Sequence, residues 1–452
     1  MKRHLVYIYC LVVFSLIVSG CSQKPEQLSR SSTSEASTNE MQFEDIYQFD
    51  PLEEFAPSGE LEYLYVGNNI EGYANEEGFY RTIPRVDGGV NLLYTDFATK
   101  HEVYLCNQPN CTHNQAGCTA WFPSSIGSHR PIPIGESLVM IHGGATGMYE
   151  MAGENALPCI ELMNLNGSER RTVCTFGADC LISPLVEDSM ARDEKNLYFT
   201  IEKYSEDETT RLLCAFNVET GKIYCLKKLN QVEEKIVGCS KDKLVLSYVT
   251  EEYTYEAKAS DLICQIEILD LTSFQVTPLV TQNYLDKGVC YNGLYYVLDH
   301  LGNLKSYNLD TREQTNEKAL QFSDEFQLNN MCFDGILDGM LLIHTYLYRE
   351  ETNDTILSSW AIDLEQEKSI EMCQSFVDPE GYDFPAIPFA EYNGELLYLS
   401  GIEVKPLDTP LPDGQVIQVD YRFCCYSMMP AEAYWNNQNV GTPIKSSFSN
   451  IG

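Results

Sequence analysis

Seven copies of one short pattern recur along this chain, and this repetition constrains its fold more than any other feature. Each copy is a turn residue followed by an apolar and aromatic run. The copies are Gly78–Tyr80, Ser137–Met140, Asn196–Phe199, Lys243–Leu246, Gly293–Tyr296, Gly339–Leu342 and Gly394–Tyr398. Runs this short, bounded by turn residues, are typical of β-strands rather than helices. The pattern therefore predicts a chain built from repeated strands.

Most copies are followed by a second run that ends in Asn or Asp. These runs are Leu93–Asp96, Ile160–Asn164, Cys214–Asn217, Ile268–Asp270, Lys305–Asn308 and Ala361–Asp363. The residues that follow, such as Asn217–Lys222, have the composition of hairpin turns, because Asn, Asp and Gly tolerate the backbone angles that these turns need.

Repeats of about 45 to 60 residues made of short strands and turns are typical of propeller blades. The sequence therefore predicts an all-β fold, a seven-bladed β-propeller over residues 46–452. A single blade cannot cover both of its faces, so neighbouring blades must bury them. Leu61–Val66 is predicted to supply a strand that joins the ring to the last blade. A pair of β-sandwiches or a solenoid is the alternative fold.

The first twenty residues have the three parts of a secretion signal in order. Lys2-Arg3-His4 precede the apolar run Leu5–Val18, and small residues follow. Val18–Cys21 match the lipobox of bacterial lipoprotein signals, in which the cysteine thiol takes diacylglycerol. We therefore predict that residues 1–20 are a cleaved signal peptide and that Cys21 is lipidated. An uncleaved anchor helix is the alternative, although the run is shorter than the ~20 residues that span a bilayer.

Residues 21–45 are predicted to be a flexible tether. Ser29–Asn39 consists almost entirely of Ser, Thr, Glu and Ala without a large apolar side chain, and such a segment cannot bury enough surface to fold. The expected location is the cell membrane, with the domain facing the extracellular side and held by the lipid on Cys21.

The charge excludes one class of partner. Without residues 1–20 the chain has 28 Lys and Arg against 66 Asp and Glu, a formal charge of −38. This charge repels nucleic acid and anionic lipid surfaces. Acidic surfaces can bind calcium, but the Asp-x-Asp-x-Asp-Gly loop of a dedicated site is absent from the sequence.

One stretch offers ligands for a metal ion. Cys106, Cys111, His113 and Cys118 place three thiols and one imidazole within thirteen residues. Zinc accepts three sulfurs and one nitrogen in a tetrahedral site, and the intervening Pro and Asn residues allow the loop to fold back. The spacing differs from that of common zinc fingers and knuckles. A disulfide, or free thiols with a solvated His113, is the alternative, because exported proteins commonly oxidise close cysteine pairs.

The same stretch carries a resemblance. Together with the lipobox, the tether and the Asn/Asp turns, Tyr104–His113 resembles uncharacterised propeller-type surface lipoproteins of anaerobic Gram-positive bacteria, over nearly the whole chain. The resemblance implies a propeller at the cell surface. It brings no catalytic residue to any position of this sequence.

Catalytic motifs are absent from the sequence: there is no Gly-x-Ser-x-Gly elbow, no His-Glu-x-x-His and no phosphate-binding glycine loop. Five histidines are isolated and are predicted to be structural: His101, His129, His142, His300 and His344. The adjacent acids Asp193-Glu194 and Glu251-Glu252 are predicted to be solvated turn residues.

Two classes of function follow from these observations. The sequence favours a binding module that holds a peptide, a glycan or a partner protein where the loops of all blades converge at the propeller channel. The alternative is an extracellular hydrolase or lyase whose active site combines acids and histidines from different blades. Several titratable groups with perturbed pKa values at one channel mouth would favour the enzyme.

Overall fold

The computed structural model describes residues 55–64, 72–123, 129–144, 157–182, 190–205, 208–250, 258–323, 326, 328–349, 354–410 and 415–446. All of them belong to the unit Thr38–Gly452. The predicted signal peptide, Cys21 and the tether at 21–45 lie outside the described residues, as do Glu251 and Glu252. Within the described part of the chain, no helix has the length and apolar character needed to cross a membrane.

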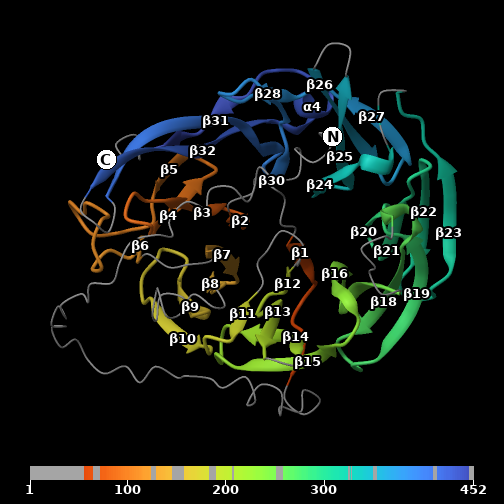
Figure 1. Ribbon diagram of the computed structural model, residues 1–452, viewed down its shortest axis with the longest axis horizontal. Helices are drawn as coiled ribbons and strands as arrows, with labels where there is room; N and C mark the ends of the chain where they lie inside the picture. Colours follow the sequence, from red (N-terminus) through yellow and green to blue (C-terminus); the bar gives the residue numbers. More distant parts are fainter. Residues whose placement is uncertain are drawn as a thin grey trace. The chain divides into compact units, whose positions relative to one another are not determined.

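Seven four-stranded antiparallel meanders form a ring around a central channel, so the prediction of a seven-bladed β-propeller is confirmed (Figure 1). In each blade the first strand lies beside the channel and the fourth lies outermost. Blade 1 comprises β2 (Gly72–Ala74), β3 (Gly78–Pro84), β4 (Val90–Asp96) and β5 (His101–Tyr104). Blade 2 comprises β7 (His129–Ile134), β8 (Ser137–His142), β9 (Cys159–Asn164) and β10 (Arg171–Thr175). Blade 3 comprises β12 (Met190–Arg192), β13 (Asn196–Tyr204), β14 (Thr209–Asn217) and β15 (Ile223–Leu229).

The remaining blades follow the same order. Blade 4 comprises β16 (Val232–Ser240), β17 (Lys243–Val249), β18 (Ile263–Asp270) and β19 (Val276–Asn283). Blade 5 comprises β20 (Lys287–Tyr291), β21 (Leu294–Leu298), β22 (Asn303–Asn308) and β23 (Gln314–Ala319). Blade 6 comprises β24 (Cys332–Leu337), β25 (Met340–Arg349), β26 (Asp354–Asp363) and β27 (Lys368–Met372). Blade 7 comprises β30 (Pro388–Tyr392), β31 (Glu395–Pro410), β32 (Val416–Pro430) and β33 (Thr442–Pro443).

A few short elements lie outside the four-stranded meanders. They are β1 (Glu62–Leu64), β6 (Trp121–Phe122), β11 (Cys180–Ile182), β28 (Ser375–Val377), β29 (Asp383–Pro385), β34 (Lys445–Ser446), η3 (Ala259–Asp261), η4 (Leu328–Asn330) and α4 (Ala431–Trp435).

The repeated sequence pattern marks the turn between the first and second strands of a blade. Asn292-Gly293 between β20 and β21, for example, has φ values of 48° and 77°. In Asp338-Gly339 and Asn393-Gly394, too, both residues have positive φ values. Two-residue hairpins of this kind require positive φ at both positions, which Asn, Asp and Gly adopt at little cost.

Each antiparallel meander places its turns alternately at two ends of the ring. The turns between strands one and two, and between strands three and four, lie at what we call the tight-turn end. The loops between strands two and three, and the connections from one blade to the next, lie at the opposite, long-loop end.

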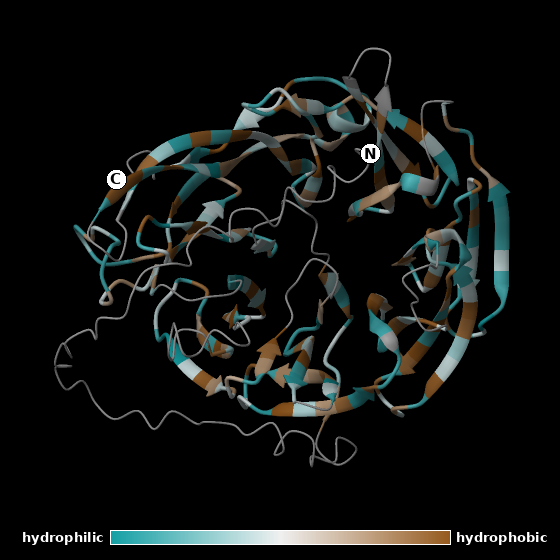
Figure 2. Ribbon diagram, in the orientation of Figure 1, coloured by the Kyte–Doolittle hydropathy of each residue, from teal (hydrophilic) through white to brown (hydrophobic). Residues whose placement is uncertain are grey.

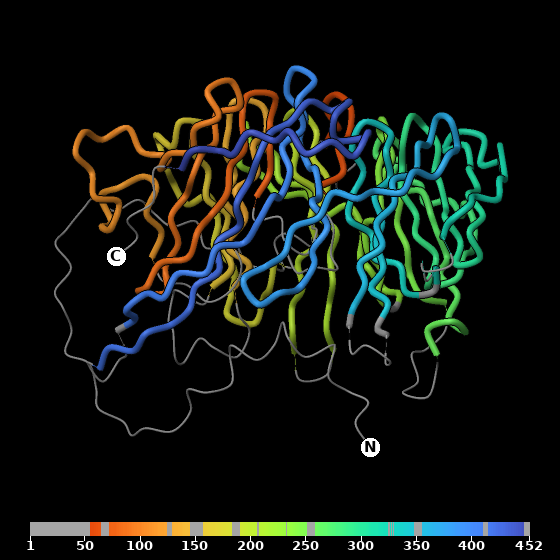
Figure 3. Tube along the Cα trace, turned by 90° about the horizontal axis from the view of Figure 1, so that it is seen from above, coloured from red at the N-terminus to blue at the C-terminus, as the bar shows by residue number. Residues whose placement is uncertain are grey.

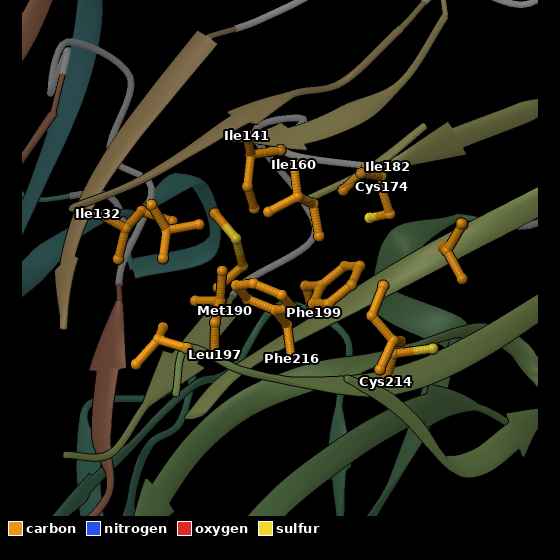
Figure 4. Packing of buried hydrophobic residues seen from close by; sticks show 14 of the residues in the cluster. Ile132, Ile141, Ile160, Cys174, Ile182, Met190, Leu197, Phe199, Cys214 and Phe216 are labelled. Atoms are coloured by element: carbon orange, nitrogen blue, oxygen red, sulfur yellow. The ribbon is translucent and has the colours of Figure 1, made fainter. Parts of the chain in front are cut away.

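The cores lie between neighbouring blades. Hydrophobic positions recur along the strands all round the ring and alternate with polar ones, as expected for pleated strands (Figure 2). Blades 2 and 3 share a cluster of fully buried side chains, and Figure 4 shows how they face one another. Its members include Ile132, Ile141, Ile160, Leu197, Phe199 and Phe216.

The prediction that Leu61–Val66 joins the last blade is wrong. Strand β1 pairs with β12, the innermost strand of blade 3, with Glu62 opposite Arg192 and Leu64 opposite Met190. Blade 7 already has four strands of its own, whereas the inner edge of β12 can accept another. Leu64 packs in the core between blades 2 and 3, which fixes this position.

The C-terminal segment joins blade 7 to blade 1. Strand β34 pairs in parallel with β5, the outermost strand of blade 1. The long β31–β32 hairpin leans across blade 1, as the side view shows (Figure 3), and Leu407 and Phe423 pack there against Ile83 and Leu93. The ring is therefore closed by its C-terminal end rather than by its N-terminal strand.

Candidate functional site

The connection from blade 1 to blade 2 folds back on blade 1 before it moves on. After β5 the chain runs through the cysteine-rich loop, residues 105–120, and returns as β6, which pairs with β4. Asn110 and His113 have φ values of 56° and 57°, a left-handed conformation that Asn adopts readily and His less so. The loop is therefore irregular, which allows closely spaced side chains to point toward one another.

The loop brings together the four predicted metal ligands. The ligand atoms of Cys106, Cys111, His113 and Cys118 all lie within 4.8 Å of one another. Nδ1 of His113 lies 3.3 Å from Sγ of Cys118, and the imidazole stacks on Tyr104 with ring centroids 4.2 Å apart. The donor set of three sulfurs and one nitrogen suits zinc.

The environment affects these groups differently. Burial raises the pKa of the Cys118 thiol to about 12 and lowers the pKa of His113, which favours the neutral imidazole that can bind a metal. At Cys106 burial acts to raise the pKa, but hydrogen bonds from the Gln108 backbone and from Cys118 outweigh it, and the net pKa is lowered.

The other cysteines after Cys21 form no disulfide with these thiols. All fifteen cysteines after Cys21 lie in the described residues, and none of them is in a disulfide. Burial raises the pKa of several thiols in the blade cores, such as Cys174, to about 12, so they behave as small apolar side chains.

Two adjoining cavities lie at the tight-turn end of the channel. The first has a volume of about 620 Å³ and is lined by β1 and by the inner-strand ends of blades 1 and 3–7. The second has a volume of about 730 Å³ and reaches the first turns of blades 1 and 2. Glu60, Glu62 and Arg192 belong to both linings.

Carboxylates dominate these linings. Ten acidic side chains line the two cavities: Glu60, Glu62, Glu76, Glu77, Glu136, Asp193, Glu194, Asp334, Asp338 and Glu391. Two cationic side chains, Arg192 and Lys241, lie among them. Both are neutralised locally, because Arg192 is paired with Glu62 at 2.7 Å and Lys241 with Asp310 at 3.3 Å.

Asp193 was predicted to be a solvated turn residue, but it is buried. It is 5% exposed and accepts hydrogen bonds from the backbone N–H groups of Ser58 and Asn196 and from the Tyr198 hydroxyl, the last at 2.6 Å. A carboxylate that accepts several backbone donors fixes a turn. Its neighbour Glu194 is exposed, as expected.

Four of the five histidines predicted to be isolated have titratable neighbours, which their positions in the sequence could not reveal. His142 lies 3.4 Å from Glu161 and stacks edge-on against His129, and His300 lies 2.8 Å from Asp286. Burial beside His142 lowers the pKa of His129 to about 3. The fifth, His101, is exposed.

His344, the remaining one of these four histidines, lies beside a carboxylate and a thiol. Nδ1 of His344 lies 2.7 Å from Asp334, and Cys332 is both its cross-strand partner and a hydrogen-bond partner. A thiol, an imidazole and a carboxylate in this order occur in nucleophilic enzymes. However, His344 is only 6% exposed, and of the three only Asp334 lines a channel cavity. We therefore assign this group to the packing of blade 6.

No protein-family model and no curated protein matches this sequence. Among solved structures, the chain is similar to an oligogalacturonate lyase from Vibrio parahaemolyticus, with a TM-score of 0.42 and 10% identity over 83% of this chain and 86% of that chain. It is also similar to a puromycin hydrolase, with a TM-score of 0.41 and 11% identity. The match covers 81% of this chain but only 61% of the length of the puromycin hydrolase. An uncharacterised protein from Listeria monocytogenes has a TM-score of 0.41 and 8% identity over 80% of this chain and 91% of that chain. At identities this low the likeness concerns the fold alone.

Proposed function

We propose that this protein is a lipid-anchored lipoprotein of the extracellular cell surface whose propeller binds a basic peptide segment of a partner protein. The binding site is the acid-lined pair of cavities at the tight-turn end of the channel. The observation that carries this proposal is the concentration of carboxylates around the two cavities. Of the ten, Asp193 fixes a turn, Asp334 pairs with His344 and Glu62 pairs with Arg192, and the other seven line the same cavities.

Cavity size and charge both support a peptide ligand. Ligand pockets in proteins usually measure about 300–1,000 Å³, and each of these cavities, at about 620 and 730 Å³, falls in that range. A converging set of like charges focuses the field in a concave site and attracts the opposite charge. Lys and Arg side chains can donate several hydrogen bonds each to carboxylates.

The sequence supports the proposed location. The lipobox Val18–Cys21 provides the attachment point, and a flexible tether over residues 21–45 would hold the domain at a root-mean-square distance of about 25–30 Å. This distance leaves the propeller free to meet partners outside the cell.

We expect Cys21→Ala to release the full chain from the membrane. A lipid contributes about 0.8 kcal/mol for each buried CH₂ group, so its loss removes most of the membrane affinity. The measurement is metabolic labelling with palmitate combined with membrane fractionation. Cys373→Ala, which changes an exposed cysteine of the propeller, should keep both the label and the membrane location. Retention of the label in Cys21→Ala would disprove the proposed attachment.

We expect the triple variant Glu76→Gln, Glu77→Gln, Glu136→Gln to bind a basic octapeptide about ten times more weakly than the wild type. Each exposed charge contributes on the order of 0.5 kcal/mol to such an attraction, and the sum corresponds to a tenfold change in Kd. The measurement is isothermal titration calorimetry of the full chain in detergent with a Lys/Arg octapeptide and, separately, with a Ser/Gly octapeptide. The affinity for the basic peptide should fall with added salt.

A matched control separates the cavity from the overall charge of the protein. Glu313→Gln, Glu317→Gln, Glu371→Gln removes the same number of charges from exposed positions at or near the outer strands of blades 5 and 6. This control should bind the basic peptide as the wild type does. Equal weakening by both triple variants would show that net charge alone attracts the peptide and would exclude the cavity as its site.

A further inference from the structure

We infer that Cys106, Cys111, His113 and Cys118 form a closed structural zinc site that holds the cysteine-rich loop against blades 1 and 2. This inference concerns the outer edge of blade 1, and none of its four ligand residues lines the cavities of the proposed peptide site.

The distances between the ligand atoms fit a zinc ion. With Zn–S bonds of about 2.3 Å and a Zn–N bond of about 2.0 Å, tetrahedral geometry places two sulfurs about 3.8 Å apart and a sulfur and a nitrogen about 3.5 Å apart. The four ligand atoms lie within 4.8 Å of one another, and the His113 Nδ1 to Cys118 Sγ distance is 3.3 Å. A small inward adjustment therefore completes the tetrahedron.

A backbone hydrogen bond points at one of the ligand sulfurs. The N–H of His113 donates to Sγ of Cys111 at 3.4 Å. Such a donor stabilises a charged thiolate more than a neutral thiol or a disulfide sulfur, because a hydrogen bond to an ionised acceptor is about twice as strong. Hydrogen bonds of this kind to the ligand atoms are a regular feature of metal centres.

The composition of the loop shows why it needs an internal crosslink. Between Leu105 and Ala120 the side chains are mostly polar and exposed, and Cys118, which is 1% exposed, is the one buried side chain among them. A segment without its own hydrophobic core is usually held by a metal or by disulfides. The left-handed backbone at Asn110 and His113 turns the loop back on itself, and a bond from the His113 imidazole to the ion would fix this turn.

The number of thiols favours zinc over a disulfide. One disulfide among three cysteines leaves the third thiol and His113 without a role, although all four groups converge. Four protein ligands fill the tetrahedron, so no position is left for a water or a substrate, and the site is structural rather than catalytic.

The site also stabilises the boundary between two blades. Arg170 of blade 2 donates hydrogen bonds to the carbonyl oxygens of Thr119 and Trp121 at the end of the loop. Cys118 packs in a cluster that contains Leu92 of blade 1 and Leu138 of blade 2. An ion that fixes Cys118 therefore fixes the seam between these blades.

The test is the metal content of the full chain, purified in detergent without oxygen or chelator and measured by mass spectrometry. We expect about one zinc ion per chain in the wild type and in Cys373→Ser, whose thiol is exposed and lies in the connection between blades 6 and 7. Cys111→Ser should lose the ion. His113→Cys offers a fourth thiolate, which zinc also accepts, and should retain it in part.

A spectroscopic measurement keeps the inference testable if Cys111→Ser does not fold. Replacement of the ion in the wild type by Co²⁺ should give the strong visible absorption and the sulfur-to-metal charge-transfer bands of a tetrahedral thiolate site. The inference would be overturned if folded protein did not show these bands, or if residues 106–118 contained a disulfide. It would also be overturned if the wild type contained no zinc, or if Cys111→Ser retained zinc fully.

Discussion

Replacing Glu102 by leucine is expected to lower the free energy of unfolding by about 3–5 kcal/mol, because it removes the bidentate carboxylate partner of a buried guanidinium. Arg81 and Glu102 are each 1% exposed. The carboxylate accepts from Nε of Arg81 at 2.6 Å and from Nη2 at 2.9 Å, so the pair is bidentate. Arg81 has a carbonyl acceptor at Cys424, which cannot neutralise its charge.

The position of this pair explains the size of the effect. Arg81 lies on β3 and Glu102 on β5, both in blade 1, and the guanidinium lies over the ring of Tyr426 in blade 7 at 4.8 Å. Ser446 of β34 donates to the Glu102 carboxylate at 2.8 Å. The ion pair therefore connects blade 1 with both C-terminal segments that close the ring.

Urea denaturation of the full chain would measure this loss, and two controls define its cause. The double variant Arg81→Leu, Glu102→Leu removes both charges and should recover much of the stability, because apolar pairs often replace buried ion pairs at little cost. Glu219→Leu breaks an exposed pair with Lys195 and should cost less than about 1 kcal/mol. If Glu102→Leu were as mild as Glu219→Leu, the pair would not stabilise the closed ring.

The sequence allowed the blades to be predicted because each blade carries its own local signals. The Asn-Gly and Asp-Gly turns have the positive φ values that define their hairpins, and the strands beside them alternate between apolar and polar positions. These signals depend on residues close together in the chain, so one blade could be recognised without the others.

Ring closure could not be predicted in the same way. Strand β1 has only three residues, and contacts made in the folded ring place it beside β12: Leu64 packs between blades 2 and 3, and Glu62 pairs with Arg192. The closing strand β34 consists of Lys445 and Ser446, whose sequence has no strand character. Its position depends on Glu102, more than 300 residues away in the chain.

For the same reason, the two candidate sites differ in how far the sequence could predict them. The four groups of the cysteine-rich loop are near one another in the sequence, so the sequence alone could suggest that they meet. The acids of the channel come from β1 and the residues before it, from the first turns of several blades, and from β24 and β30, and their convergence depends on the ring. The neighbours of His344 also depend on strand register, since Cys332 faces it across two antiparallel strands.

Replacing Phe199 by alanine is expected to lower the free energy of unfolding by about 3–5 kcal/mol. Phe199 lies on β13, is 0% exposed and projects into the cluster shared by blades 2 and 3 (Figure 4). Alanine loses the transfer free energy of the ring and leaves a cavity. The strands around this cavity are held by their own hydrogen bonds, so they cannot move in to fill it. Urea denaturation would measure the loss as a lower midpoint.

An exposed apolar residue provides the matched control for this position. Leu301 is 72% exposed in the turn between β21 and β22, so Leu301→Ala should change the stability by no more than about 0.5 kcal/mol. An unchanged midpoint for Phe199→Ala would show that blades 2 and 3 do not depend on this interface. A lower midpoint with an unchanged denaturant slope would show that the ring still unfolds cooperatively. In that case the interface between two blades contributes to the stability of all seven, because each blade needs its neighbours to cover its faces.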